Sequence, residues 1–398
     1  MRLRRNSRKL REVSEIGLKA GDFPLRPSQS YELNLSLLRY RISIRSMKIL
    51  QISPYFPPHL GGVEYHVKGL ADGLTKRGYQ VSVASSCGRC KTEFIRVPSI
   101  DLFYAPLPLK RIRLEADIYH SHIPSPLFAF MLRKASPQVV TYHNDVVVPV
   151  RLNGFTFPRW FGTSLEWLNR RLVQPVLDEA EIVVATTKSY AETSPVLRNY
   201  LHKIRIVPNA VDVSVYPQRM GRGKENYVLY VGRLLNYKGI DSLLSAMSEV
   251  QKRADLRLVL VGDGYDRRSL EEQAARMKVR AQFTGRLERK MLIDILSRAE
   301  MLVLPTSNRL EAFGIVLLEA MACETPVLAF DTPGVNEVAM QGGRVFSSTA
   351  ELADSILELH ENEPLRMSLG RRGRRAVEEK YSWSRVLDEI ESVYSEIA

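Results

Sequence analysis

Two carboxylates eight positions apart are the residues of this sequence best suited to hold a polar ligand. Glu311 and Glu319 flank the apolar run AFGIVLL, which favours a helix, and a predicted buried strand at 301–305 precedes the loop that carries Glu311. Gly314 lies at the helix start, where free N–H groups and the helix dipole favour an anion. One helix could then hold a diphosphate at its tip and hydroxyl-bearing rings at both carboxylates, as in a nucleotide-sugar site. The alternative is that both glutamates are merely solvated.

Two cations follow another predicted strand, in the segment GRLLNYKG at 232–239. Arg233 offers a fork-shaped donor and Lys238 a mobile ammonium just before a predicted helix, and both suit a diphosphate. The spacing differs from that of a P-loop, so no Walker motif is predicted. A lysine before a helix is usually only solvated, but two cations together with a carboxylate pair favour a phosphate site.

The first half of the chain also places ligand-compatible residues after predicted strands. Gly61 and Gly62 follow the strand at 48–53, and their lack of a Cβ lets a ligand approach the start of the next helix. His143 follows the strand that begins at Gln138, and open α/β sheets bind ligands at the carboxyl ends of their strands. The alternatives are that the glycines only form a turn and that His143 is structural. No G-x-G-x-x-G is present, so a dinucleotide site is not predicted.

Neither the cysteines nor the paired histidines predict a metal site. Cys87 and Cys90 have the spacing of a redox pair or of half a zinc site, but no second pair exists and Cys323 is distant in sequence. His120 and His122 share one face of a predicted strand without an evident third ligand. We expect packing roles for these residues and no bound metal.

Aromatic and arginine side chains alternate in the segment 151–177. Such a mixture suits the interface of an anionic membrane, while the alternative is a helix whose aromatic side chains fill the core of the first domain. The residues concerned are Phe155, Phe157, Trp160, Phe161 and Trp167 with Arg151, Arg159, Arg170 and Arg171.

Alternating strand and helix patterns occur twice, before and after a polar linker at 214–226. Each series reads as βαβ units, which form a parallel sheet with helices on both faces. The sequence therefore predicts an α/β fold with two Rossmann-like, doubly wound domains, at 47–215 and 216–379. Their ligand-binding faces are expected to meet at a cleft.

The N-terminal segment 1–46 differs from the rest in charge. It holds 11 Lys and Arg residues against 4 Asp and Glu, and so contributes over half of the formal net charge of +13. We predict a disordered basic tail and hypothesise that Met47, which opens MKILQIS, is the true start. A nucleic-acid-binding arm is the less favoured alternative.

Composition excludes several classes of protein. The 398 residues suit two domains, and no apolar run is long enough to cross a membrane. The sequence shows no secretory signal, and 3 cysteines are too few for a disulfide framework. We therefore expect a cytoplasmic protein, with peripheral contact to the inner face of the membrane if 151–177 binds lipid.

Taken together, these motifs resemble the family 4 glycosyltransferases, which are retaining enzymes of the GT-B fold. The resemblance runs from about Met47 to the C-terminus and rests on PYFPPHLGGVEYHV, VTYHND, VPNAVD, VGRLLNYKG, VGDG, EAFGIVLLE and MACETPV. It implies that the last helix, at 380–398, packs back on the first domain. Glu324 stands where the family often has Gly, and Asp331 to Gly334 replace a more usual Gly-Gly.

The resemblance also implies a role for each candidate residue. Arg233 and Lys238 would hold the donor diphosphate, Glu311 would contact the transferred sugar, and Glu319 would bind the ribose hydroxyls. Gly62 would let the first domain approach the diphosphate, and His143 would lie near the transferred sugar. Backbone amides would complete the donor site at Phe313, Gly314, Ile315 and Val316.

The implied reaction is transfer from a UDP- or GDP-sugar with retention, without an obligatory metal or other cofactor. No D-x-D motif is found in a suitable loop, and cations can substitute for a metal at the leaving group. The acceptor would be a glycan, a polyprenyl-linked glycan or a glycolipid. Two rivals remain: a nucleotide-sugar epimerase with the same two-domain architecture, and a non-catalytic nucleic-acid binder that uses the basic tail.

Overall fold

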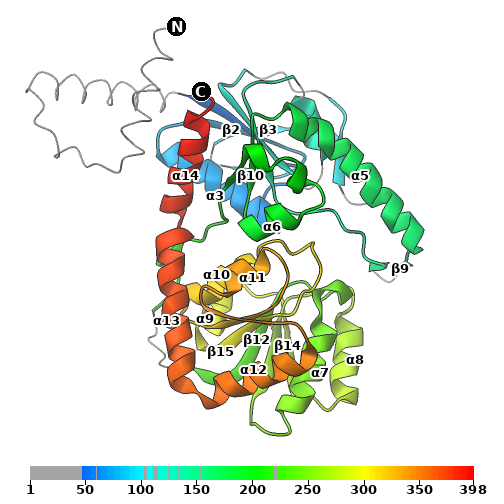
Figure 1. Ribbon diagram of the computed structural model, residues 1–398, viewed down its shortest axis with the longest axis vertical. Coiled ribbons are helices and arrows are strands. Elements are labelled where there is room, and N and C mark those ends of the chain that lie inside the picture. Colours follow the sequence, from blue (N-terminus) through cyan, green and yellow to red (C-terminus); the bar gives the residue numbers. More distant parts are fainter. Residues whose placement is uncertain are drawn as a thin grey trace, which may run out of the picture. The chain divides into compact units, whose positions relative to one another are not determined.

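The computed structural model describes residues 47–398 apart from 60, 91, 103–104, 111–114, 124–125, 133, 153–154 and 219–222. The tail predicted at 1–46 lies outside the described residues. The described chain forms two lobes, each built on a parallel sheet (Figure 1). The first lobe extends from β1 to η4 and the second from β12 to α13. The predicted α/β class with two Rossmann-like units is confirmed.

The sheet of the first lobe has seven parallel strands, and its central ones are buried on both faces. Their near-continuous runs of Val and Ile are typical of a sheet covered on both sides. In spatial order the strands are β11 (Ile204–Ile206), β10 (Ile182–Ala185), β7 (Gln138–Tyr142), β6 (Ile118–Ile123), β1 (Lys48–Ile52), β2 (Gln80–Ser85) and β3 (Glu93–Arg96).

Two antiparallel ribbons and several helices complete the first lobe. The ribbons pair β4 (Ser99–Leu102) with β5 (Ala105–Pro108) and β8 (Arg151–Leu152) with β9 (Phe155–Thr156). The helices are α3 (Gly62–Lys76), α4 (Pro126–Ala129), η1 (Phe130–Leu132), α5 (Arg159–Glu179), α6 (Lys188–Thr193), η2 (Leu197–Asn199), η3 (Leu201–Lys203) and η4 (Val213–Val215).

The sheet of the second lobe has six parallel strands. Their spatial order is β14 (Ala281–Gly285), β13 (Arg257–Val261), β12 (Glu225–Val231), β15 (Ala299–Leu304), β16 (Val327–Phe330) and β17 (Gly343–Phe346). The covering helices are η5 (Asn236–Lys238), α7 (Ile240–Val250), α8 (Arg267–Arg276), α9 (Arg289–Arg298), α10 (Ile315–Ala322), α11 (Val335–Ala339), α12 (Thr349–Glu361) and α13 (Glu363–Lys380).

The order of the strands fixes where ligands can be bound. In the second lobe the order reverses between β12 and β15, and in the first lobe it reverses between β6 and β1. At such a switch point the loops after the two neighbouring strands diverge and leave room at the carboxyl edge of the sheet. The loops that carry Lys238 and Glu311 follow β12 and β15, so the topology brings these two residues together.

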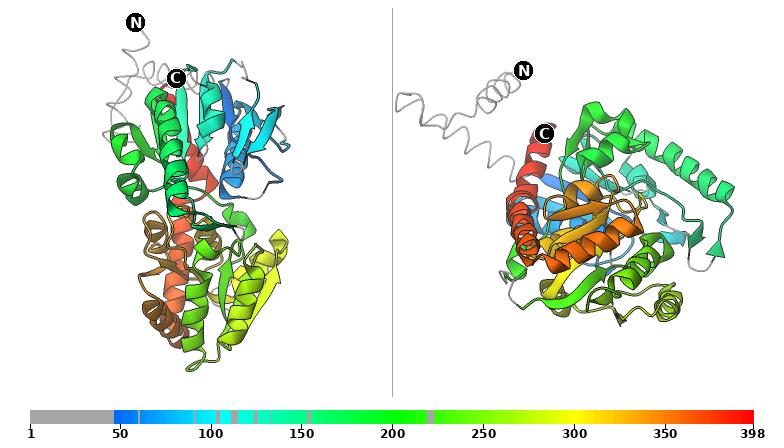
Figure 2. Two further views of the ribbon diagram at one scale, coloured as in Figure 1. Left: turned by 90° about the vertical axis from the view of Figure 1, so that its right-hand side faces the viewer. Right: turned by 60° about the horizontal axis from the view of Figure 1, so that its bottom comes forward.

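The last helix, α14 (Trp383–Ser395), returns to the first lobe and packs on α3, and Figure 2 shows α13 and α14 following one another past both lobes. A Cβ added at Gly69 of α3 would lie 2.0 Å from Cζ2 of Trp383, so the absence of a side chain there allows the contact. The hydroxyl of Tyr394 lies 2.7 Å from Nδ1 of His120. An ion pair between Arg77 and Glu391 closes the other end of the contact at 2.8 Å.

Candidate functional site

Lys238 and Glu311 form an ion pair at the switch point of the second lobe. Lys238 Nζ lies 2.7 Å from Glu311 Oε2, and the two side chains are only 12% and 22% exposed. Gly239 has φ +72°, and a Cβ there would lie 2.2 Å from the carbonyl oxygen of Pro305. A glycine is therefore required where the loop after β12 meets the loop after β15.

The second carboxylate oxygen of Glu311 is held by the start of α10. Gly314 N donates to Glu311 Oε1 at 3.1 Å, and Gly314 caps the helix with φ +76°. Phe313 is buried against the ring of Tyr381, which anchors the turn in the core. Ile315 and Val316 open the helix, where amides have no intrahelical acceptor. A carboxylate, an ammonium and a helix N-terminus therefore meet at one point.

The N-terminus of α3 in the first lobe approaches this point. A Cβ added at Gly62 would lie 3.1 Å from Cδ1 of Ile315, so the first turns of α3 and α10 lie next to each other. Both helices present the positive ends of their dipoles here, and such ends favour an anion. The structure thus brings Gly62 next to the start of α10. The approach of a ligand to Gly62 stays a prediction.

Arg233 lies at the same turn but is exposed and makes a different contact. Its Nη2 donates to the hydroxyl of Tyr237 at 3.1 Å, while its backbone carbonyl accepts from Tyr230 Oη at 3.0 Å. The described contacts do not join Arg233 to Glu311. Its guanidinium stays available to a ligand at the edge of the site.

Glu319 has partners that the sequence did not indicate. Its Oε1 pairs with Nη1 of Arg289 and accepts from Tyr216 Oη at 3.1 Å, while Arg289 Nη2 also donates to Tyr216. Burial and the adjacent carboxylate raise the pKa of the Tyr216 phenol well above its usual range. Glu319 is therefore engaged by a guanidinium at the position where the resemblance implies ribose hydroxyls. Tyr216 fell in the predicted linker, and Arg289 gave no signal beyond its charge.

His143 follows β7 and belongs to a cluster of four buried histidines. His122 Nδ1 and His143 Nε2 lie 3.3 Å apart, and His66 and His120 complete the cluster. Burial lowers the pKa of His66 to about 4 and that of His120 to about 3. It also holds the pKa of His122 and His143 well below the usual range, so the cluster is neutral at physiological pH. His143 can thus accept or donate a hydrogen bond but carries no charge.

No metal site emerges in the part of the chain that the structure describes. Within it, no group of three or more His, Cys, Asp or Glu side chains is arranged to hold an ion. Cys87 and Cys90 are free cysteines, and Cys323 is buried. His120 accepts or donates to Thr141 and Tyr394, both at 2.7 Å, which is the packing role expected for it.

A charged pair between the lobes was not predicted from the sequence. Arg309 Nε lies 3.1 Å from Asp145 Oδ2, and Asp145 is buried in the first lobe. Asp145 closes the VTYHND segment, and Arg309 stands in the loop before Glu311. Both positions could have been noticed as charges in ligand-binding loops, but nothing in the sequence pairs them.

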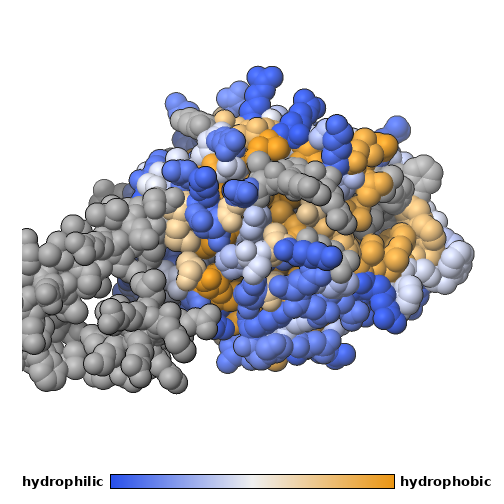
Figure 3. All heavy atoms as spheres, turned by 90° about the horizontal axis from the view of Figure 1, so that it is seen from above, coloured by the Kyte–Doolittle hydropathy of each residue, from blue (hydrophilic) through white to orange (hydrophobic). Residues whose placement is uncertain are grey.

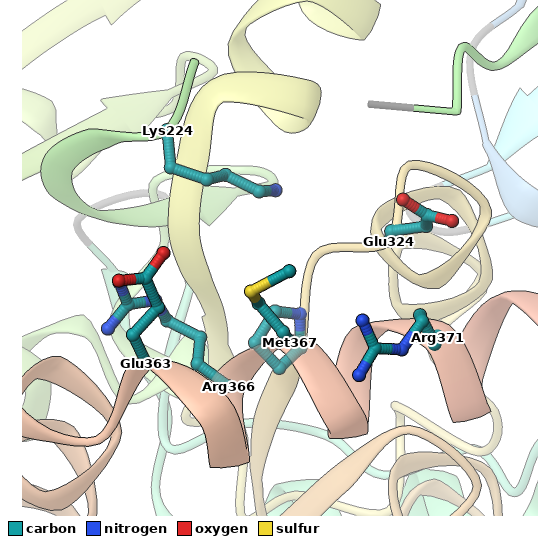
Figure 4. Close-up of a pocket in the computed structure, with 7 residues that line it drawn as sticks. Lys224, Glu324, Glu363, Arg366, Met367 and Arg371 are labelled. Atoms are coloured by element: carbon teal, nitrogen blue, oxygen red, sulfur yellow. The ribbon is translucent and has the colours of Figure 1, made fainter. Parts of the chain in front are cut away.

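Two hollows of the described surface contain none of the predicted site residues. One is lined by Lys224 and by Arg366, Met367 and Arg371, the last three on α13 (Figure 4). Its volume of ≈ 10 Å³ has room for about one water molecule. The other hollow, of ≈ 330 Å³, lies between the end of β10 and the junction of α13 and α14. Neither one adds to the arrangement around Lys238 and Glu311.

Helix α5 exposes the tryptophans of the segment predicted to contact lipid or fill the core. Trp160 is 71% exposed and Trp167 is 59% exposed, which excludes the core-filling interpretation for both. Arg171 lies 5.4 Å from the ring centre of Trp167. Among the described residues, no helix combines the length and the apolar character needed to cross a membrane.

The sequence and the fold match known proteins along most of the chain. The family model described as Glycosyltransferase Family 4 matches residues 60–215, and the one described as Glycosyl transferases group 1 matches 216–376. The O-antigen chain mannosyltransferase C of Escherichia coli is 27% identical in an alignment of 383 positions, which covers 88% of this chain and 98% of that protein. The phosphatidyl-myo-inositol mannosyltransferase of Mycobacterium leprae is 29% identical and covers 88% of this chain and 97% of its own length.

A solved structure shows the same architecture. Sucrose-phosphate synthase from Thermosynechococcus elongatus superposes with a TM-score of 0.70 at 21% identity, over 88% of this chain and 98% of that one. Two parallel Rossmann-like sheets of this kind define the GT-B fold. The two family models follow one another and together span both lobes. The chain therefore belongs to glycosyltransferase family 4, among the glycosyl transferases of group 1, and is a glycosyltransferase of the GT-B fold.

Proposed function

We propose that this glycosyltransferase moves a sugar from a nucleoside diphosphate sugar, with retention at the anomeric carbon, to a glycan or lipid-linked acceptor. The observation that carries the proposal is the 2.7 Å pair of Lys238 Nζ and Glu311 Oε2 beside the N-terminus of α10. An ammonium and a helix N-terminus stabilise the charge of a departing diphosphate. A carboxylate next to them can accept hydrogen bonds from the hydroxyls of the transferred sugar.

In the proposed reaction, the bond between the anomeric carbon and the diphosphate oxygen breaks, and the acceptor hydroxyl bonds to the same face of the sugar. The leaving diphosphate takes the electron pair, and one of its oxygens accepts the proton of the acceptor. Arg233, Lys238 and the first turn of α10 stabilise the developing charge. Glu311 orients the sugar, and the neutral imidazole of His143 contributes a hydrogen bond near it.

We further propose that no metal is obligatory, because these cations serve the leaving group. Turnover should persist in excess EDTA. Loss of activity that Mg²⁺ or Mn²⁺ restores would contradict this part of the proposal. Retention is tested separately, by NMR assignment of the anomeric configuration of the product against that of the donor.

Nucleotide binding tests the donor site directly. Thermal melting is measured with UDP, GDP and ADP for the wild type, for Glu319→Ala and for Glu272→Ala, whose carboxylate forms only an exposed pair with Arg268 on α8. A ligand at about 100 times its Kd adds roughly 2.7 kcal/mol of stability, so binding is readily seen. We expect one base to stabilise the wild type and Glu272→Ala but not Glu319→Ala. If none of the three nucleotides raises the melting temperature of the wild type, the proposal loses its basis.

The names of relatives support an acceptor that is a growing glycan or a lipid. The Escherichia coli relative is named for the O-antigen chain, and the Mycobacterium leprae relative for phosphatidyl-myo-inositol. Both are named mannosyltransferases, so a mannosyl donor is the first to assay. Acceptors to be compared are a phosphatidylinositol lipid, a polyprenyl-linked glycan and a free oligosaccharide.

The surface of α5 supports contact with an anionic membrane. Trp160 and Trp167 are seven residues apart and thus share a helix face, on which Arg171 is also exposed. Aromatic side chains among arginines suit the boundary between lipid headgroups and acyl chains. Figure 3 shows hydrophobic residues gathered among hydrophilic ones on its right-hand side, the side on which α5 begins, next to β9, in Figure 1.

Vesicle binding tests this contact. Cosedimentation with vesicles that contain anionic lipid, at low salt, is compared with neutral vesicles for the wild type and for Trp160→Ala/Trp167→Ala. Tyr265→Ala serves as the matched control, because Tyr265 is 61% exposed on the second lobe. We expect the double variant alone to lose binding, and we expect added salt to weaken wild-type binding. If the wild type does not cosediment with anionic vesicles even at low salt, the proposed membrane contact is wrong.

A further inference from the structure

Asp145 is a buried carboxylate of the first lobe that is almost completely hydrogen-bonded. It is 4% exposed, and its Oδ1 accepts from Tyr142 Oη at 2.9 Å and from Ser194 Oγ at 2.7 Å. Its backbone N–H donates to the hydroxyl of Tyr190. A buried negative charge requires a compensating cation nearby, because water cannot solvate it.

That cation comes from the second lobe. Arg309 approaches Asp145 Oδ2 through Nε at 3.1 Å, and its Nη1 donates to Thr193 Oγ1 at 3.2 Å. The guanidinium lies 4.7 Å from the ring centre of Tyr190, whose hydroxyl donates to the backbone carbonyl of Arg309 at 3.1 Å. Both the side chain and the backbone of Arg309 are therefore bound to the first lobe.

The two partners lie next to the proposed reaction centre in each lobe. Asp145 is two residues after His143, and Arg309 is two residues before Glu311. The intervening turn is itself fixed, because Glu311 N donates to Asn308 O at 3.0 Å. A displacement of Arg309 must therefore be transmitted to Glu311.

We propose that Arg309 and Asp145 are positioning residues for glycosyl transfer, and we name their ion pair the interlobe clamp. The clamp holds the loop that carries Glu311 against the strand end that carries His143, and so it aligns the two lobes around the transferred sugar. It rests on the proposed function, since it assumes that Glu311 and His143 face that sugar. Neither Arg309 nor Asp145 touches the reacting atoms.

The clamp predicts a specific pattern in the kinetics. The groups proposed to bind the nucleotide, Arg233, Lys238 and Glu319, all belong to the second lobe, so nucleotide affinity should not depend on the clamp. Alignment of sugar and acceptor should depend on it, and a misplacement near 1 Å can cost about 10²-fold in rate. Loss of the clamp should therefore lower kcat about 10- to 100-fold while the nucleotide Kd changes less than about twofold.

The variants are Arg309→Gln, Asp145→Asn and the double variant, with Arg309→Lys as the conservative replacement. Arg77→Gln is the matched control, because Arg77 also forms an ion pair, with Glu391 at 2.8 Å, that joins the first lobe to α14. We expect both single variants to lose kcat, the double variant to lose no more than either, and Arg309→Lys to recover part of it. Arg77→Gln should retain wild-type kcat.

Hydrogen exchange supplies a readout that needs no substrate. Amides of 306–313 and 143–146 should exchange faster in Arg309→Gln than in the wild type or in Arg77→Gln. Unchanged exchange, unchanged kcat in a folded variant, or additive losses in the double variant would each overturn the clamp. Absence of nucleotide binding or transfer in the wild type would instead count against the proposed function, and exchange would still decide whether the clamp fixes the two loops.

Discussion

Lys238 is the residue whose loss should slow the proposed reaction most, because its ammonium would stabilise the leaving diphosphate. Its ammonium is mostly buried and lies 2.7 Å from Glu311 Oε2. We expect Lys238→Ala to lower kcat about 10²-fold, the usual cost of one preorganised electrostatic donor, and to weaken nucleotide binding much less. Steady-state kinetics and nucleotide titrations check this. Lys252→Ala is the control, because Lys252 forms only an exposed pair with Glu249. An unchanged rate for Lys238→Ala would end the assignment.

The buried histidines give stability a dependence on pH. Their pKa in the unfolded chain is near 6.5, whereas burial lowers the pKa of His66 to about 4. Between these values the unfolded chain binds a proton that the folded chain excludes, so stability is full above pH 6.5 and falls as the pH drops toward 4. His66 alone should account for about 3 kcal/mol across this window. Urea unfolding at several pH values between 4.5 and 7.5 measures the slope.

His66→Phe separates the contribution of this residue from that of its neighbours. Both ring nitrogens of His66 are buried without a hydrogen-bond partner, so a phenyl ring removes two unsatisfied polar atoms. We expect the variant to be at least as stable as the wild type at neutral pH and to lose stability less steeply in acid. A slope equal to that of the wild type would show that His66 does not resist protonation.

The sequence indicated the residue types of the candidate site but not the partners that the structure gives them. The sequence predicts both Lys238 and Glu311 as candidate site residues, and the topology of β12 and β15 explains why they meet. Arg289 and Arg309 were not predicted from the sequence, because an isolated arginine in a polar segment belongs to no periodic pattern or motif. Their carboxylate partners lie 30 and 164 positions away in the chain.

At the scale of elements, the end of α8 carries a residue in an unfavourable backbone conformation. Lys278 has φ +55°, and its N–H donates to Ala275 O while that of Val279 donates to Ala274 O, as at a helix end that usually takes glycine. We expect Lys278→Gly to raise the free energy of unfolding by about 1 kcal/mol. Lys278→Ala removes the same ammonium but keeps the Cβ, so it should give no such gain. Chemical denaturation of both variants measures the difference.

Long periodic elements were predictable, whereas short or irregular ones were not. The apolar face of α3 and the buried runs of β12 and β15 follow patterns with a clear period. The ribbon of β4 and β5 has only four residues in each strand, too few for a period to be recognised. Helix α5 was ambiguous because its aromatic residues suit either a core or a surface, and only the fold decides which face is covered.

At the scale of the whole chain, the alternation of strands and helices was sufficient to predict two parallel sheets. Parallel strands need crossovers, and the sequence supplies a helix between most of them. The contacts of the first lobe with the second lobe and with α14 could not be predicted in the same way. They depend on single close approaches, such as those at Gly62 and Gly69, which composition and periodicity do not encode.

The return of α14 to the first lobe depends on one of these approaches. A Cβ at Gly69 would lie within 2.6 Å of three ring atoms of Trp383, so Gly69→Ala must displace α3 or α14. We expect a loss of about 1–3 kcal/mol in the free energy of unfolding, as for overpacking in a core. We also expect faster proteolysis of the connection between α13 and α14.

Gly162→Ala is the matched control, because it makes the same change within a helix and its Cβ would meet Val148 only at 3.4 Å. That variant should be as stable as the wild type or more so, since alanine favours a helix over glycine. Equal melting temperatures for Gly69→Ala and the wild type, with α14 still protected, would mean that the helix tolerates a shift and does not fix the first lobe to the second.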